Sequence, residues 1–171
     1  MAKGLPRSMS RGSAQAAPIR RQVIRLTDVP VTVSGAVGIG FGTVPVAAFP
    51  EGNITFLGAV AYLQLSTASA NVTATFTGAF SLGTAATADS TLSGAEVDII
   101  PQTTLTAATA KVSPRTRATH AVAVTGTVID NTNIGTINLN VLIDDASVSA
   151  DNNACLVNGE IILSYVTMFD D

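Results

Sequence analysis

A chain of 171 residues is long enough for one domain with a hydrophobic core, so neither a disulfide nor a metal is needed for stability. Asp, Glu, Lys and Arg make up only 12% of the residues, against about 25% in typical soluble proteins. The polar surface must instead come from Thr, Ser and Asn, which favours strands and contact with other proteins. No apolar run approaches the roughly 18 residues of a membrane-spanning helix, so no membrane partner is expected.

The basic residues are concentrated at the N-terminus. The first 25 residues hold six of the nine basic residues and no acidic one, whereas all twelve acidic residues follow. Gly, Pro and Ser interrupt this stretch, and no alternating hydrophobic face begins before Ile19. The sequence therefore predicts an extended basic arm over residues 1–28, with strand-like pairing from about residue 22, and a body over residues 29–171.

The arm has two interpretations. A basic tail containing Gly and Ser can bind nucleic acid by neutralising phosphates. It can also order on an acidic protein surface, and the apolar residues interleaved near its end favour this second reading, so nucleic acid is not the expected partner. The residues predicted to contact a partner protein or a neighbouring subunit are Arg7, Arg11, Ile19, Arg20, Arg21, Val23, Ile24, Arg25 and Leu26.

A glycine-rich segment, Ser34–Gly42, has the spacing of a phosphate loop only superficially. Such a loop needs a helix directly after it, whose N-terminal amides hold the anion. Here the extended sequence Thr43-Val-Pro45 follows. Glycines in a strand more often mark bulges or a close approach of two backbones, and this is the structure that we expect.

The segments after these glycines alternate with period two, the pattern of half-buried antiparallel strands. Residues 54–65 are apolar on both faces, which indicates either the central strand of two packed sheets or a subunit contact. Residues 72–80 show the cleanest alternation, with Phe76 pointing inward and Thr75 outward. Further strands are expected over 121–129, 136–144 and 160–169; in the second of these, Asn138 and Asn140 should point outward.

Two arginines lie close together in the body. Arg115 and Arg117 are two residues apart, so in an extended segment their side chains project to the same side. They belong either to a solvated turn after Pro114 or to ion pairs between subunits.

The candidates for chemistry are weak. The chain has one histidine, His120, and one cysteine, Cys155, which leaves no four-ligand zinc set and no marked nucleophile. Oxygen ligands in the loop Asp144–Asn153 are of the kind that binds calcium, but the glycine and closing glutamate of an EF-hand are missing. A solvated turn or an acidic docking edge is the preferred reading. We therefore expect no enzyme, no cofactor, no metal and no small-molecule substrate.

Strands separated by clusters of Gly, Pro, Asn and Asp predict an all-β protein, an antiparallel β-sandwich of jelly-roll type with the basic arm attached. Three segments then resemble small virion proteins of tailed bacteriophages, most of all the head decoration, or cement, proteins: Phe49–Tyr62, Ser93–Pro101 and Leu142–Asp145. The resemblance implies a β-sandwich, often trimeric, on the outer surface of an icosahedral head. There it would clamp neighbouring major capsid subunits, often through an extended terminal arm.

The predicted function is therefore capsid decoration by a homotrimer that is made in the host cytoplasm and bound to the outside of the head. Two alternatives remain open. One is a tail or head-fibre component. The other is a carbohydrate- or receptor-binding β-sandwich, which is less favoured because the chain has no Trp and only two tyrosines, Tyr62 and Tyr165, for stacking on sugars.

Overall fold

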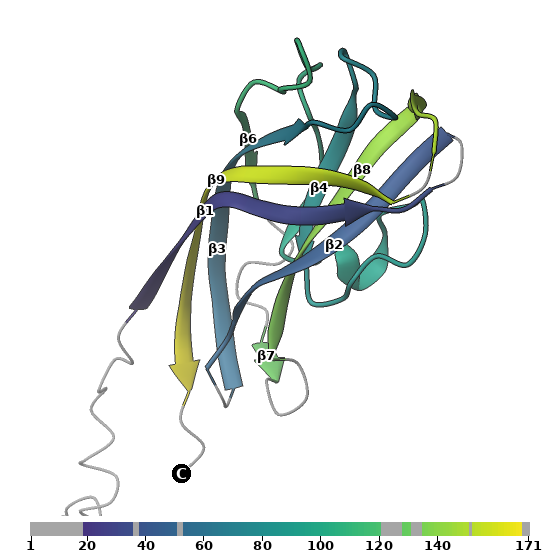
Figure 1. The fold of residues 1–171 in the computed structure, drawn as a ribbon. Helices are drawn as coiled ribbons and strands as arrows, with labels where there is room; N and C mark the ends of the chain where they lie inside the picture. The colour runs from purple at the N-terminus through teal and green to yellow at the C-terminus, as the bar shows by residue number, and fades with distance from the viewer. Residues whose placement is uncertain are drawn as a thin grey trace, which may run out of the picture.

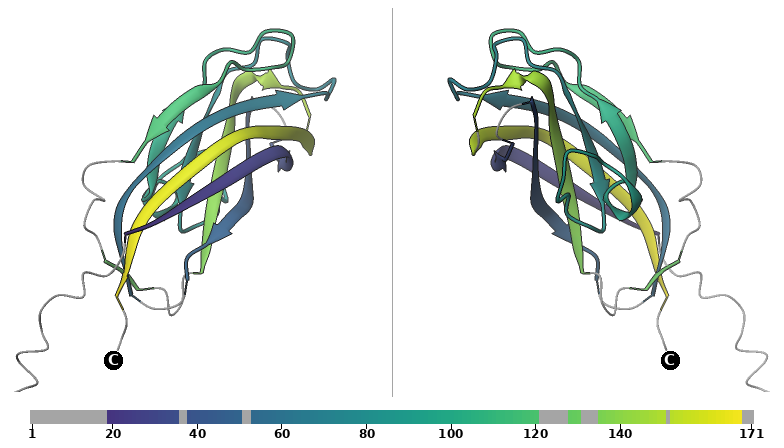
Figure 2. Two further views of the ribbon diagram at one scale, coloured as in Figure 1. Left: turned by 90° about the vertical axis from the view of Figure 1, so that its left-hand side faces the viewer. Right: turned by 90° about the vertical axis from the view of Figure 1, so that its right-hand side faces the viewer.

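The computed structural model describes residues 19–35, 38–50, 53–120, 128–130, 135–150 and 152–168. In this part of the chain, two antiparallel sheets pack face to face, and the only helix is the short 3-10 turn η1 (Gly94–Glu96) (Figures 1 and 2). The strands are β1 (Ile19–Val33), β2 (Gly38–Ala48), β3 (Asn53–Thr67), β4 (Gly78–Gly83), β5 (Ile100–Thr104), β6 (Thr116–Thr119), β7 (Val128–Asp130), β8 (Thr136–Val148) and β9 (Asn153–Met168).

The strand order identifies the fold. One sheet runs β1-β9-β3-β6, with β7 also paired to β3, and the other runs β2-β8-β4-β5. Strands β6 and β7 pair with different parts of β3 and together fill one edge position. The chain thus passes between two four-position sheets in the order of a jelly roll. The predicted all-β antiparallel sandwich is confirmed.

The body begins earlier than the predicted boundary. Strand β1 starts at Ile19 and pairs with β9 from Ile19–Val166 onward, with one register shift between Leu26 and Val29. Residues 19–28, predicted to belong to the arm, are therefore part of the sheet. The sequence predicted strand-like pairing only from about residue 22 and did not assign it to the body, because the partner strand β9 lies at the other end of the chain.

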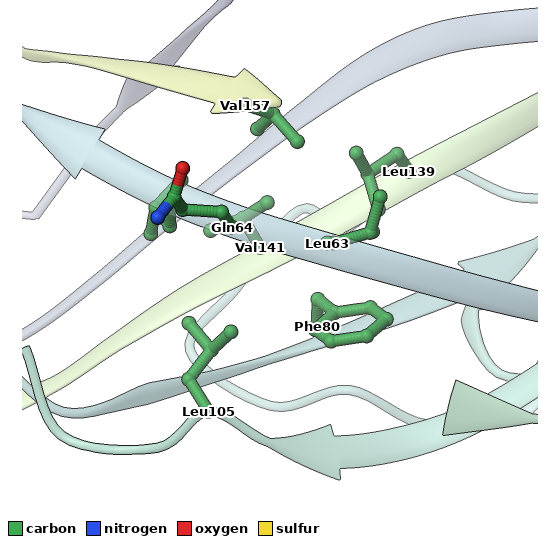
Figure 3. A pocket seen from close by; sticks show the side chains of 8 residues that line it. Leu63, Gln64, Phe80, Leu105, Leu139, Val141 and Val157 are labelled. Carbon is green, nitrogen blue, oxygen red and sulfur yellow. The ribbon is translucent and has the colours of Figure 1, made fainter. Parts of the chain in front are cut away.

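Strand β3 is the central strand that one reading of its two apolar faces predicted. Ile54, Phe56, Ala61 and Leu63 point into the sandwich and are at most 2% exposed. A small void of about 10 Å³ lies among Leu63, Gln64, Phe80, Leu139 and their neighbours (Figure 3). A space of this size is too small for a small-molecule ligand.

The prediction of a strand over 72–80 is wrong for residues 72–77. Only Gly78–Gly83 forms β4, whereas the segment before it follows an irregular path. Its backbone bonds to the following loop: the Ala108 amide donates to Phe76 O, and the Lys111 amide to Ala74 O. Phe76 is nevertheless fully buried and Thr75 exposed, as predicted.

Asn138 and Asn140 point to the outer side of their sheet, as predicted, but they are not exposed. Both side chains are buried, at 8% and 0% exposure, because the segment 84–99 covers the outer face of the second sheet at this point. The Asn140 Nδ2 donates to Ala85 O at 3.0 Å and to Glu96 O at 3.1 Å. These two residues thus fasten a long connection to β8.

The glycines of β2 lie where the backbones of the two sheets approach. A Cβ on Gly42 would lie 2.3 Å from Thr32 O, and one on Gly40 would lie 2.4 Å from Val33 Cγ1. Neither position can accept a side chain without displacing β1. The expected close approach of two backbones is confirmed at Gly42, whereas Gly40 makes room for the Val33 side chain.

Candidate interaction surface

The two sheets differ in what covers their outer faces. The segment 84–99 lies over the second sheet and hydrogen-bonds to it. On the outer side of β1-β9-β3-β6, which Figure 2 shows in its left panel, no described segment plays this part, and large side chains there reach solvent. We call this surface the outer sheet face; its residues are Arg21, Val23, Arg25, Leu57, Val60, Tyr62, Arg117, Glu160, Ile162 and Ser164.

The centre of the outer sheet face is apolar. Val23 pairs with Ile162, which pairs in turn with Val60. Val23 is 46% exposed, while Ile162 and Val60 are half-buried. This row crosses three strands and contains no polar side chain. An apolar surface of this kind, when no other part of the same protein covers it, commonly marks an interaction site.

A charged row crosses all four strands beside this apolar row. The Arg25 Nε lies 3.7 Å from Glu160 Oε2. Farther along the row, the Arg117 guanidinium carbon lies 5.9 Å from the centre of the Tyr62 ring, within the range of a cation–π contact. These contacts orient the two arginine side chains. Because both arginines are exposed, a partner protein can still reach their charges.

An open hollow of about 230 Å³ lies next to the apolar row, lined by Leu57, Gly58, Ala59, Val60, His120, Ile162 and Ser164. Its shape depends on a bulge in β3, where the register shifts between Phe56 and Gly58. A Cβ on Gly58 would come within 2.9 Å of the His120 ring, so the glycine makes room for the imidazole. The His120 Nδ1 lies 3.3 Å from Ala59 O.

The structure separates the residues predicted for the arm into three groups. Arg7 and Arg11 lie outside the described residues. Ile19, Arg21, Val23 and Arg25 alternate outward on β1 with Arg20, Ile24 and Leu26, which belong to the opposite side. Leu26 is 6% exposed and Ile24 packs against the core, so these two residues stabilise the body itself.

Arg115 and Arg117 both lie at the free edge of the β1-β9-β3-β6 sheet and are exposed. Arg117 contacts Tyr62 of its own sheet. Whether either arginine pairs with another subunit stays a prediction.

The candidates for catalysis lie apart. Cys155 is fully buried beside Thr67, and burial raises the pKa of its thiol, while the hydrogen bond with Thr67 lowers it. Cys155 pairs with Thr67 at one end of the contact between β3 and β9, whereas His120 lies over Gly58 near the other end. The two side chains therefore form no nucleophile–base pair.

The loop after β8 is tied to its neighbour. Asn153 is buried, its Oδ1 accepts from Ser69 Oγ at 2.8 Å, and its Nδ2 donates to Ala150 O. Within the described ranges no three His, Cys, Asp or Glu side chains come together as a metal site, and Asp151 lies outside those ranges. No helix in the described part of the chain has the length and hydrophobicity to cross a bilayer.

Neither a protein-family model nor a curated protein sequence matches the chain. Among solved structures, a chain from infectious bursal disease virus strain Gx is 13% identical over 86% of this chain, with a TM-score of 0.41. This chain spans only 33% of that viral chain.

Two further structures match over nearly their whole length. A chain of the cyanophage Pam1 capsid asymmetric unit is 19% identical over 92% of this chain and 96% of its own length, with a TM-score of 0.39. A maize chlorotic mottle virus chain is 13% identical over 90% of this chain and 97% of its own, with a TM-score of 0.31. These superpositions are loose, so the fold assignment rests on the strand order.

Proposed function

We propose that this chain is a virion structural protein, a decoration protein that attaches to the outer surface of a phage head, binds the major capsid protein and assembles as a homotrimer. The observation that carries the proposal is a jelly-roll body with a partly apolar sheet face that no described segment covers. The first strand of this face, β1, directly follows a basic N-terminal segment. Jelly rolls serve capsid and lectin domains alike, so the proposal relies on the character of the surface and not on the fold.

Attachment would use two kinds of contact. Basic residues before Ile19 attract an acidic protein surface, and this attraction weakens as salt screens exposed charges. Apolar residues on β1, among them Ile19 at 70% exposure, add burial that salt does not screen. In a trimer, three such attachments act together, because binding of one raises the effective concentration of the others.

The carbohydrate-binding alternative is disfavoured by the state of Tyr62. Tyr62 is the aromatic residue that is exposed in the described part of the chain, and its exposed fraction is 43%. Sugar-binding sites commonly stack a ring against the sugar, but Arg117 lies over the Tyr62 ring. A tail or head-fibre location is the remaining alternative.

Deletion of residues 1–18 tests the proposal. Since β1 begins at Ile19, we expect the truncated protein to melt at the temperature of the full chain but to bind undecorated heads at least tenfold more weakly, with a smaller salt dependence. The measurements are a thermal melt and a binding series on heads over increasing salt. Full-affinity binding by the truncated protein would remove the N-terminal segment from the mechanism, and binding to tails instead of heads would support the alternative location.

A further inference from the structure

We propose that the outer sheet face is itself a docking surface for an acidic protein, and that the hollow beside His120 receives an apolar side chain of that partner. The inference deepens the proposed function, on which it rests, by naming the part of the body that contacts the capsid protein. It concerns residues of the folded sheet, so it is separate from the role of residues 1–18.

Apolar exposure indicates that the surface is an interface. Val23 and Tyr62 are 46% and 43% exposed on neighbouring rows, although the second sheet of the same protein is covered by its own segment 84–99. The hollow lies beside the apolar row, and its lining includes Val60, Ile162, Ser164 and the His120 ring that lies over Gly58. A shape of this kind accepts one protruding side chain, as the central pocket of an interface commonly does.

Charge specifies the partner. Arg21, Arg25 and Arg117 lie on the outer sheet face against one acidic side chain, Glu160. The apolar centre is thus bordered by net positive charge on a protein whose overall charge is −3. A partner with carboxylates around an apolar projection would complement both features, and Arg is well suited to such carboxylate contacts.

A second copy of the same face is a poor partner because like charges would meet. A two-fold axis parallel to the strands, between β9 and β3, would set Arg25 of one copy over Arg117 of the other. An axis across the strands at Ile162 would set Arg25 of one copy over Arg21 of the other. Opposed like charges across an interface are unfavourable, so these two face-to-face pairings of two copies are disfavoured.

Nucleic acid fits less well than an acidic protein. Phosphate binding uses the arginines but has no use for the row formed by Val23, Ile162 and Val60. Single strands would need aromatic rings for stacking, and Arg117 already lies over Tyr62. The apolar centre therefore favours a protein.

Two substitutions in the full chain test the surface, each with a matched control. Ser164→Tyr fills the hollow, while Thr32→Tyr places the same side chain at an exposed position near the other end of β1. Arg21→Glu reverses a charge on the outer sheet face, while Arg20→Glu makes the same change on the neighbouring residue, whose side chain alternates to the opposite side. We expect Ser164→Tyr and Arg21→Glu each to weaken binding to undecorated heads about tenfold or more, and the controls about twofold or less.

Melting temperatures verify that each variant is folded, and Arg21→Glu keeps the test decisive if Ser164→Tyr disturbs β9. If the wild-type protein binds heads and both variants bind them equally well, this inference is overturned and the proposed function stands. No binding by the wild-type protein would overturn both.

Two other results would assign the face to a different partner. If Arg21→Glu binds duplex DNA more weakly but binds heads normally, the face belongs to nucleic acid. A smaller particle mass for free Ser164→Tyr in light scattering would assign it to self-association, which also contradicts the inference.

Discussion

Phe76→Ala is expected to lower the free energy of unfolding by about 3–5 kcal/mol, the range for removing a large aromatic side chain from a core. Phe76 is completely buried, yet it belongs to an irregular segment that is held by backbone hydrogen bonds to Ala108 and Lys111. The loss should therefore be accompanied by loosening of this segment. Denaturant unfolding of both proteins measures the difference.

Thr75→Ala is the matched control, because Thr75 is the neighbouring residue and is exposed. We expect a change of roughly 0.5 kcal/mol or less. Equal losses in the two variants would contradict the orientation of this segment, and a loss below about 1 kcal/mol for Phe76→Ala would contradict its place in the core.

This segment shows what alternation in the sequence can predict. The pattern from Val72 to Phe80 correctly placed Phe76 inside and Thr75 outside, because burial depends on which side of the chain faces the core. It did not distinguish a strand from an irregular segment, since that depends on hydrogen bonds to residues 108–111, which local sequence does not encode. Composition and turn residues were sufficient for the sandwich as a whole.

Asn140→Asp is expected to destabilise the protein by about 3 kcal/mol at neutral pH, because it replaces a buried donor with a charged acceptor. The Asn140 Nδ2 donates to two carbonyl oxygens, Ala85 O and Glu96 O, while its Oδ1 accepts from Thr43 Oγ1 at 2.6 Å and from the Thr87 amide at 3.0 Å. The Asp carboxylate can still accept the hydrogen bonds from Thr43 Oγ1 and the Thr87 amide. It cannot donate to Ala85 O and Glu96 O, and its negative charge would face these two carbonyl oxygens. Segment 84–99 should then detach locally and exchange its amide protons faster.

The pH dependence gives a second readout of Asn140→Asp. Burial raises the pKa of such a carboxyl above its unfolded value, so the variant should regain stability relative to the wild type as pH falls and the carboxyl becomes protonated. Asn71→Asp, on an exposed residue, should change stability by about 0.5 kcal/mol or less. A melting curve of Asn140→Asp that matches this control would contradict the role of Asn140 in holding the segment.

The two asparagines of β8 mark a limit of sequence reasoning about sites. Alternation placed Asn138 and Asn140 outward, and they do lie on the outer side of their sheet, but a segment more than forty residues away along the chain covers them. The same long-range effect moved the start of the body to Ile19, because β1 pairs with β9. The sequence predicted the outer sheet face in part, because residues 54–65 are apolar on both sides and a subunit contact was one interpretation of this pattern. The hollow was not, because it depends on the bulge at Gly58 and on a contact with His120.

The most direct test of the central claim is a cryo-EM map of the phage particle that we propose contains this chain. The account predicts jelly-roll density on the outside of the head, in groups of three, with the β1-β9-β3-β6 sheet turned toward the major capsid protein and β1 leading into density along a capsid seam. Density for this fold in the tail alone, inside the head against packaged DNA, or nowhere in the particle would contradict it.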